Sequence, residues 1–167
     1  MRKTLLLLLA CALPQIGWGQ LMFRTTLSGS NEVPQRDTPA TGIGHAMLDL
    51  DSKMFVFNYT FENLVAPQAA AHIHGPAPAG MNAGVLYPLP LGSPSFLMTM
   101  LTDMDIEQLR GGLWYVNVHS TTYPGGEIRG QFVPVPEAST YAIGAAGLLG
   151  IALLRRYRRA RLERLAA

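Results

Sequence analysis

The sequence predicts an all-β domain, a β-sandwich of about seven short strands with one short helix. Three observations predict this class. Several short segments alternate apolar and polar residues, clusters of glycine and proline separate them, and one stretch alone carries helix-capping features. A secretory signal is expected before the domain and a transmembrane helix after it, which divides the chain into residues 1–19, 20–134 and 135–167.

Four strands are expected in the first half of the domain. The first two cover residues 21–28 and 42–51, the third follows a turn at residues 51–53, and the fourth covers residues 69–74. The third strand places four aromatic side chains on one face: Phe55, Phe57, Tyr59 and Phe61. Aromatic side chains bury the largest areas, so we expect this row in the core. A platform for stacking carbohydrate is the alternative interpretation of the row.

A fifth strand is expected over residues 95–101, with Phe96, Met98 and Met100 on one face. The thioethers of Met98 and Met100, together with that of Met104, are possible ligands for copper(I). Packing is, however, the usual role of methionine on an apolar strand. A short helix should then run from its cap at Thr102 to Arg110, where Gly111 and Gly112 end it.

Residues 113–132 predict a hairpin. Its turn, Tyr123-Pro124-Gly125-Gly126, matches a type II turn, in which the glycine after the proline takes the positive φ. One face of the hairpin is apolar, and the other collects Asn117, His119, Glu127 and Arg129. Glu127 and Arg129 lie two residues apart on that face, so the simplest interpretation is a surface ion pair.

The N-terminus reads as a secretory signal. A basic start is followed by an apolar run, and small residues precede a cleavage position after Gly19. Cys11, the only cysteine of the chain, lies within this run, where it also fits a lipoprotein box imperfectly. The mature domain therefore has no cysteine and can form no disulfide.

The C-terminus has three parts. Pro136, Glu137 and Ala138 are followed by an uncharged apolar run and then by a cluster of arginines, which includes Arg155, Arg156, Arg158 and Arg159. The run is long enough for a short transmembrane helix, and the arginines would hold its end in the cytoplasm. A buried helix with a basic tail is the alternative.

This tail resembles the PEP-CTERM sorting signal of bacterial envelope proteins. The resemblance implies a precursor anchored in the inner membrane, recognition by an exosortase-type enzyme, removal of the tail, and release to the cell surface or extracellular matrix. Residues 20–137 carry five cations and ten acids, a net charge of −5. A basic patch for a phosphate backbone is thus missing, which argues against nucleic acid as a partner.

Three motifs resemble the CHRD domain: FRTTLSGSNEVP from Phe23, AHIHGPA from Ala71, and LWYVNVHSTTYPGGEIRGQ from Leu113. The likeness covers residues 22–133. It implies a β-sandwich of immunoglobulin-like or superoxide-dismutase-like form and an extracellular setting, but no agreed activity.

Three histidines are candidate metal ligands. His72 and His74 project from the same face of one strand, and His119 lies near the end of another. If the two strands are neighbours, three imidazoles can reach one copper or zinc ion, with Glu127 as a fourth ligand or as a partner of a ligand. The alternative is a structural role in which these histidines bond loop carbonyls. His45 is expected on the surface.

The sequence shows neither a nucleophile with a nearby base nor a glycine-rich loop that enters a helix. It therefore favours a non-enzymatic, extracytoplasmic interaction module, whose partners would be the exopolysaccharide matrix or envelope proteins. A copper- or zinc-binding protein is the alternative.

Overall fold

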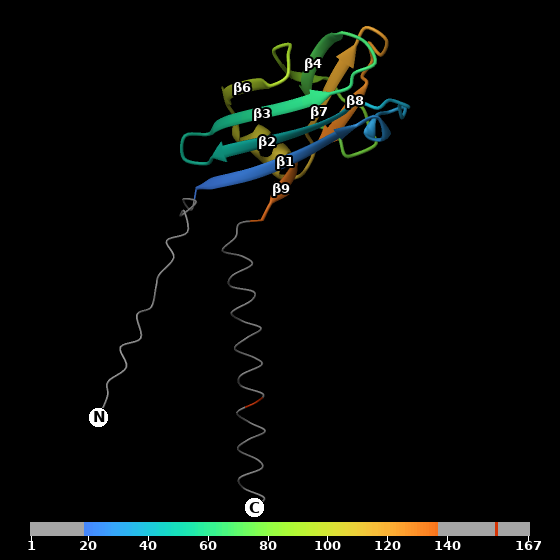
Figure 1. Ribbon diagram of the computed structural model, residues 1–167. Coiled ribbons are helices and arrows are strands. Elements are labelled where there is room, and N and C mark those ends of the chain that lie inside the picture. The colour runs from blue at the N-terminus through green and yellow to red at the C-terminus, as the bar shows by residue number, and fades with distance from the viewer. Residues whose placement is uncertain (1–18, 137–155, 157–167) are drawn as a thin grey trace, which may run out of the picture.

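The computed structural model describes residues 19–136 and Arg156 (Figure 1). In this part of the chain, nine strands form one antiparallel sheet in the order β5-β4-β7-β8-β1-β2-β3-β6, and β9 pairs with β1. The strands are β1 (Gln20–Ser28), β2 (Thr41–Asp49), β3 (Met54–Glu62), β4 (Gln68–His74), β5 (Val85–Pro88), β6 (Ser95–Met100), β7 (Tyr115–Ser120), β8 (Ile128–Gln131) and β9 (Val133–Val135).

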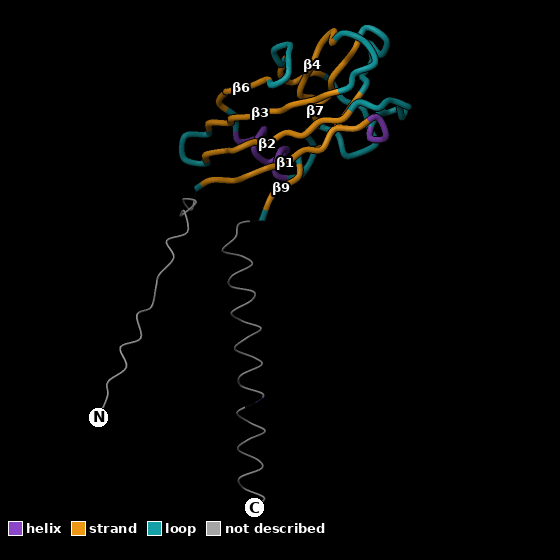
Figure 2. Tube along the Cα trace, in the orientation of Figure 1, coloured by secondary structure: helices purple, strands orange, loops and turns teal. Residues whose placement is uncertain are grey.

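The all-β class is thereby confirmed, but the expected division into two sheets is not observed. A single sheet curls into a half-barrel, so that strands from its two ends face each other across one interior (Figure 2). The ring of Phe55 on β3 lies 6.1 Å from that of Trp114, next to β7, and the rings of Phe57 and Phe132 are 5.0 Å apart. The pattern of alternation is the same in a sandwich and in a curled sheet, so the sequence did not distinguish them.

The row of aromatic residues on β3 forms the centre of the core, as expected. Phe55, Phe57 and Tyr59 are almost completely buried. Along the sequence, the first residue that packs in this core is Leu21 and the last is Phe132. The core of the described residues therefore lies within the segment 20–136, which we expect to fold on its own.

Two short elements interrupt the strands. The 3₁₀ helix η1 (Gly29–Asn31) follows β1, and α1 (Asp103–Arg110) covers part of the core with Ile106 and Leu109. Thr102 caps α1, because its hydroxyl accepts from the N–H of Asp105 while the Asp105 carboxylate accepts from the N–H of Thr102. The predicted helix is confirmed. Strand β5 was not predicted, because its proline suggested a break; as an edge strand it tolerates Pro88.

The hairpin of β7 and β8 is confirmed, but its turn differs from the prediction. The N–H of Gly126 donates to the carbonyl of Tyr123 at 3.0 Å, and Gly126, rather than Gly125, takes the positive φ of 124°. A type II turn needs a positive φ at Gly125, so this turn is not of that type.

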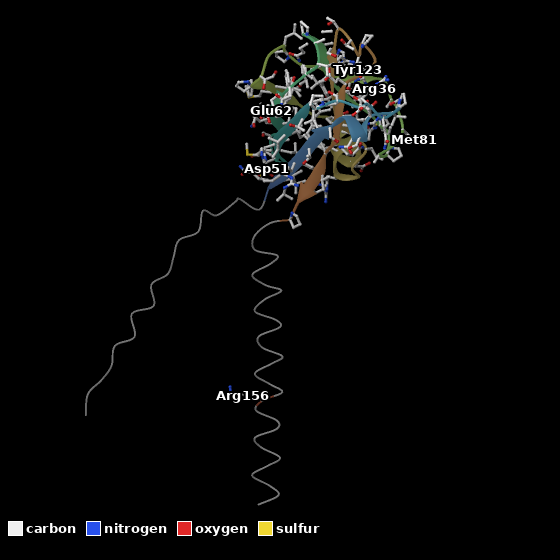
Figure 3. The ribbon with its side chains drawn as sticks, turned by 45° about the vertical axis from the view of Figure 1, so that its right-hand side comes forward. Arg36, Asp51, Glu62, Met81, Tyr123 and Arg156 are labelled. Atoms are coloured by element: carbon white, nitrogen blue, oxygen red, sulfur yellow. The ribbon has the colours of Figure 1, made fainter. Side chains whose placement is uncertain are left out.

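The face of the sheet away from the core is covered at one end only. Loops pack on β7 and β8 there, and one of them, 75–84, includes Met81 at the side of the domain opposite Asp51 and Glu62 (Figure 3). Another loop brings Arg36 over the ring of Tyr123, with 5.1 Å between the guanidinium carbon and the ring centre. Strands β2, β3 and β6 leave many of their outward side chains exposed.

The sorting residues fall mostly outside the described part. Pro136 is its last domain residue and is exposed, and Arg156 is exposed too. Outside the described residues lie residues 1–18 of the expected signal (1–19), the expected membrane helix, Glu137, Ala138, Arg155, Arg158 and Arg159. Within the described residues, no helix is both long enough and apolar enough to cross a membrane.

Candidate metal centre

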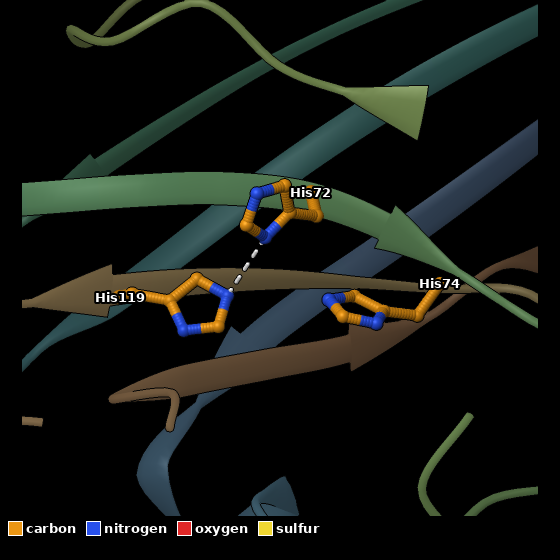
Figure 4. A group of neighbouring side chains, drawn as sticks. All are labelled: His72, His74 and His119. Carbon is orange, nitrogen blue, oxygen red and sulfur yellow. Dashed lines mark hydrogen bonds between the residues drawn. The ribbon is translucent and has the colours of Figure 1, made fainter. Parts of the chain in front are cut away.

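The three candidate histidines meet at one place on the outward face of the sheet (Figure 4). Strands β4 and β7 are antiparallel neighbours, in which His72 lies opposite Asn117, and His119 lies opposite Ala70. His72 and His119 are therefore diagonal neighbours, and His74 follows on the same face. One ring nitrogen from each histidine lies within 4.8 Å of those of the other two. The condition set by the sequence, that the two strands be neighbours, is met.

Backbone carbonyls orient two of the rings. Nδ1 of His74 lies 3.1 Å from the carbonyl oxygen of Ala83, and Nδ1 of His119 lies 2.9 Å from that of Pro124. A carbonyl only accepts, so both Nδ1 atoms carry the proton in these bonds. When these rings are neutral, each Nε2 consequently keeps its lone pair, and such second bonds are typical of metal-ligating histidines.

The remaining ring closes the cluster. Nδ1 of His72 lies 3.1 Å from Nε2 of His119 (Figure 4). Because the His119 Nε2 is the acceptor, His72 Nδ1 donates in the metal-free protein. Nε2 of His74 is buried and has no hydrogen-bond partner among the described residues. A buried polar atom without a partner is unfavourable, and a cation at the centre of the three rings would satisfy it.

The surroundings of the three imidazoles favour their neutral form. Burial lowers the pKa of His72, His74 and His119 below its ordinary value. For His74 and His119, the carbonyl bonds oppose this shift, while the neighbouring histidines add to it. Neutral imidazole is the form that binds a metal ion, so at neutral pH protons compete weakly for these nitrogens.

A layer of contacts near His74 fixes the loop 75–84, whose Ala83 carbonyl accepts from the His74 ring. The ring of Tyr115 stacks parallel to His74 with 5.0 Å between centres, and its hydroxyl accepts from the N–H of Ala83. The guanidinium of Arg129 lies 3.4 Å from the Tyr115 ring centre. Arg129 also donates to Asn82 Oδ1 and to the carbonyl of Met81, so that it anchors the loop just before Ala83.

Glu127 is not brought into the cluster. Its Oε1 accepts from the Thr38 hydroxyl at 2.6 Å and from the N–H of Val65 at 2.9 Å, and its side chain is completely buried. The expected surface ion pair of Glu127 with Arg129 is wrong, because both residues are buried and the guanidinium is used elsewhere. Among the described residues, the salt bridge is the one between Lys53 and Asp103.

Sequence reasoning missed the residues that orient the site. Ala83 and Pro124 act through their carbonyls, which no side-chain pattern reveals. Tyr115 alternates with Asn117 and His119 along β7, and this alternation was the available signal for it. His45 is exposed on β2, as expected.

A groove of about 1000 Å³ lies beside the covered face, between β1, β9 and the loop after η1. Glu32 lines this groove. Only 4% of the residue is exposed, and its Oε1 has no hydrogen-bond partner within residues 19–136. Burial raises the pKa of Glu32 to about 7, against the N–H of Val33 and the charges of Arg129 and Arg36. The sequence did not predict that Glu32 is buried, because this glutamate follows a turn motif of a kind that usually lies at the surface.

Comparison with known proteins identifies a family. The family model of the CHRD domain matches residues 23–132, which is most of the described domain and includes all three histidines of the cluster. No curated protein and no solved structure is significantly similar to the chain. The chain therefore belongs to the CHRD family.

Proposed function

We propose that this domain is a non-enzymatic metal-binding module that holds one copper(II) or zinc ion through His72, His74 and His119. The observation that carries the proposal is the convergence of three ring nitrogens within 4.8 Å, with two rings oriented by carbonyls. Three neutral imidazoles suit both ions, and the usual order of stability places copper(II) above zinc.

The geometry leaves room for a further ligand. His74 and His119 are buried, whereas His72 is only partly buried and forms the solvent side of the cluster. A four-coordinate ion would therefore take its last ligand, water or a small anion, from the side of His72. To bind through Nδ1, His72 would change to its other neutral tautomer, losing the Nδ1 proton to solvent and gaining one at Nε2. The hydrogen bond to His119 would then be replaced by two bonds to the ion.

A titration of residues 20–136 with copper(II) and with zinc tests the proposal. The expected result is one ion per chain, bound with at least 100-fold higher affinity than by the His72→Ala, His74→Ala double variant. His45→Ala is the matched control, because it removes an exposed imidazole outside the cluster. For copper(II), electron paramagnetic resonance should show nitrogen ligands in the wild type and in the His45 variant.

Thermal stability gives a second measurement. An ion that binds the folded state alone stabilises it by about 2.7 kcal/mol at 100 times the dissociation constant. The wild type should gain this stabilisation, and the double variant should not. Equal and weak binding by both proteins would reject the metal site and leave the histidines with their structural bonds to Ala83 and Pro124.

The termini support a separate proposal about location. We propose that the chain is exported, held in the inner membrane by its C-terminal segment, and released to the surface or matrix by an exosortase-type enzyme. The order of motif, apolar run and arginines supports this proposal. At the surface, the matrix polysaccharide and envelope proteins would be its neighbours and possible partners.

Substitution of Arg155, Arg156, Arg158 and Arg159 by glutamine tests the sorting proposal. Immunoblots of the full chain in a producing bacterium should show an unprocessed or misoriented precursor. Arg110→Gln is the control, because Arg110 is an exposed arginine of the domain. Normal processing and release of the fourfold variant would contradict the proposal.

A further inference from the structure

The exposed part of the outward face carries an unusual number of methionines. On β1, β2 and β3, the core side chains alternate with outward ones, which include Met22, Met47 and Met54. On β6, Phe96, Met98 and Met100 point outward, whereas Leu97 packs against the core. Five of the eight methionines of the chain therefore lie on one face of four adjacent strands.

The strand register makes these five side chains one continuous patch. Met22 lies opposite Met47, and Met54 lies opposite Met100. Val56 links the two pairs, since it lies opposite both Met47 and Met98. Directly opposite residues have Cβ atoms about 5 Å apart, and diagonal ones are about 7–8 Å apart. Met54, Met98 and Met100 thus form a triangle whose flexible side chains can bring three sulfur atoms together.

Packing does not explain this triangle. Met98 is 58% exposed and Met100 is 65% exposed, which contradicts the expectation that they belong to the core. Surface strands favour β-branched residues, and an exposed thioether gains little from the hydrophobic effect. What methionine alone among apolar residues offers here is a soft, uncharged sulfur ligand.

We propose that Met54, Met98 and Met100 form a binding site for a soft monovalent cation, copper(I). Three neutral thioethers provide no charge to balance a divalent ion, and sulfur ligands favour copper(I) over calcium or magnesium. Met22 and Met47 extend the patch, and they offer further sulfur atoms beside the triangle. This site goes beyond the proposed function and does not rest on it. The histidines lie on β4 and β7, which strands β8, β1 and β2 separate from β3 and β6.

Residues 20–136 with carbon-13-labelled methionine methyl groups allow a direct test with silver(I), which has the same charge and softness and is not oxidised in air. The methyl signals of Met54, Met98 and Met100 should shift and saturate at one ion per chain. The signal of Met81 should stay unchanged, because Met81 is equally exposed but lies on the loop at the far side of the domain (Figure 3).

Leucine variants separate sulfur ligation from apolar character. Met98→Leu with Met100→Leu keeps size and hydrophobicity, and it should lower the affinity for copper(I) at least 10-fold in competition with a coloured copper(I) chelator. Met81→Leu is the matched control and should bind as the wild type does. The wild-type and leucine sequences are compared in the His72→Ala, His74→Ala background, because neutral imidazole also binds copper(I); failure of the histidine site and failure of this site are then told apart.

Two results would overturn the proposal. One is unchanged copper(I) affinity in the Met98→Leu, Met100→Leu variant. The other is a silver(I) response in which Met81 shifts together with the patch, which indicates adventitious binding to any exposed thioether.

Discussion

The buried carboxyl of Glu32 should make the stability of the domain depend on pH in a way that one substitution removes. Its pKa is raised from 4.5 to about 7, chiefly by burial. Folding therefore favours the protonated form. The stability that this proton provides is fully present below pH 4.5 and is lost as the pH rises through about 7.

The magnitude follows from the shift. Each pKa unit corresponds to about 1.4 kcal/mol, so a shift from 4.5 to about 7 gives an upper limit of about 3 kcal/mol. Glu32 lines an open groove, where water screens the charge, so we expect about half of that limit. Glu32→Gln imitates the protonated side chain, and its carbonyl oxygen can still accept from the N–H of Val33.

The assay is urea unfolding of residues 20–136 followed by tryptophan fluorescence. Trp114 is the single tryptophan in this segment and is completely buried, so its emission reports global unfolding. The variant should match the wild type at pH 4 and exceed its free energy of unfolding by about 1–2 kcal/mol at pH 8. A difference that is the same at both pH values would refute the argument, whatever its sign.

Three other substitutions test the core, the turn and the loop. Phe57→Ala should lower the free energy of unfolding by about 3–5 kcal/mol, because it removes a completely buried ring between those of Tyr59 and Phe132; a loss below 1 kcal/mol in urea unfolding would contradict this core. Gly126→Ala should cost about 1–3 kcal/mol, since a Cβ there meets Asn117 and Glu32 at a positive φ. Its control Gly125→Ala should be nearly neutral. A larger loss of stability in Gly125→Ala than in Gly126→Ala would instead support a type II turn, in which Gly125 takes the positive φ. Arg129→Met should cost about 2 kcal/mol, because Asn82 and the Met81 carbonyl lose a charged donor. Hydrogen exchange should then become faster in residues 78–84, and unchanged protection there would show that Arg129 does not hold the loop.

The local structure was determined by the sequence itself. Alternation with a period of two identified β1 to β4, β6 and the hairpin strands, because each strand shows its own two faces in consecutive residues. The capping box of α1 is equally local, since Thr102 and Asp105 are three residues apart. The same alternation placed His72 and His74 on one face, and it put His119 on the polar face of its strand.

Only the tertiary structure decided what those faces meet. Nothing local distinguishes a strand face open to water, such as that of Met98 and Met100, from one under a loop, such as that of Arg129. The pairing of β4 with β7 joins segments more than forty residues apart, and the carbonyls of Ala83 and Pro124 take part through the backbone. Side-chain patterns record which face a residue occupies, whereas contacts between distant segments depend on how the whole sheet curls and on where its loops return.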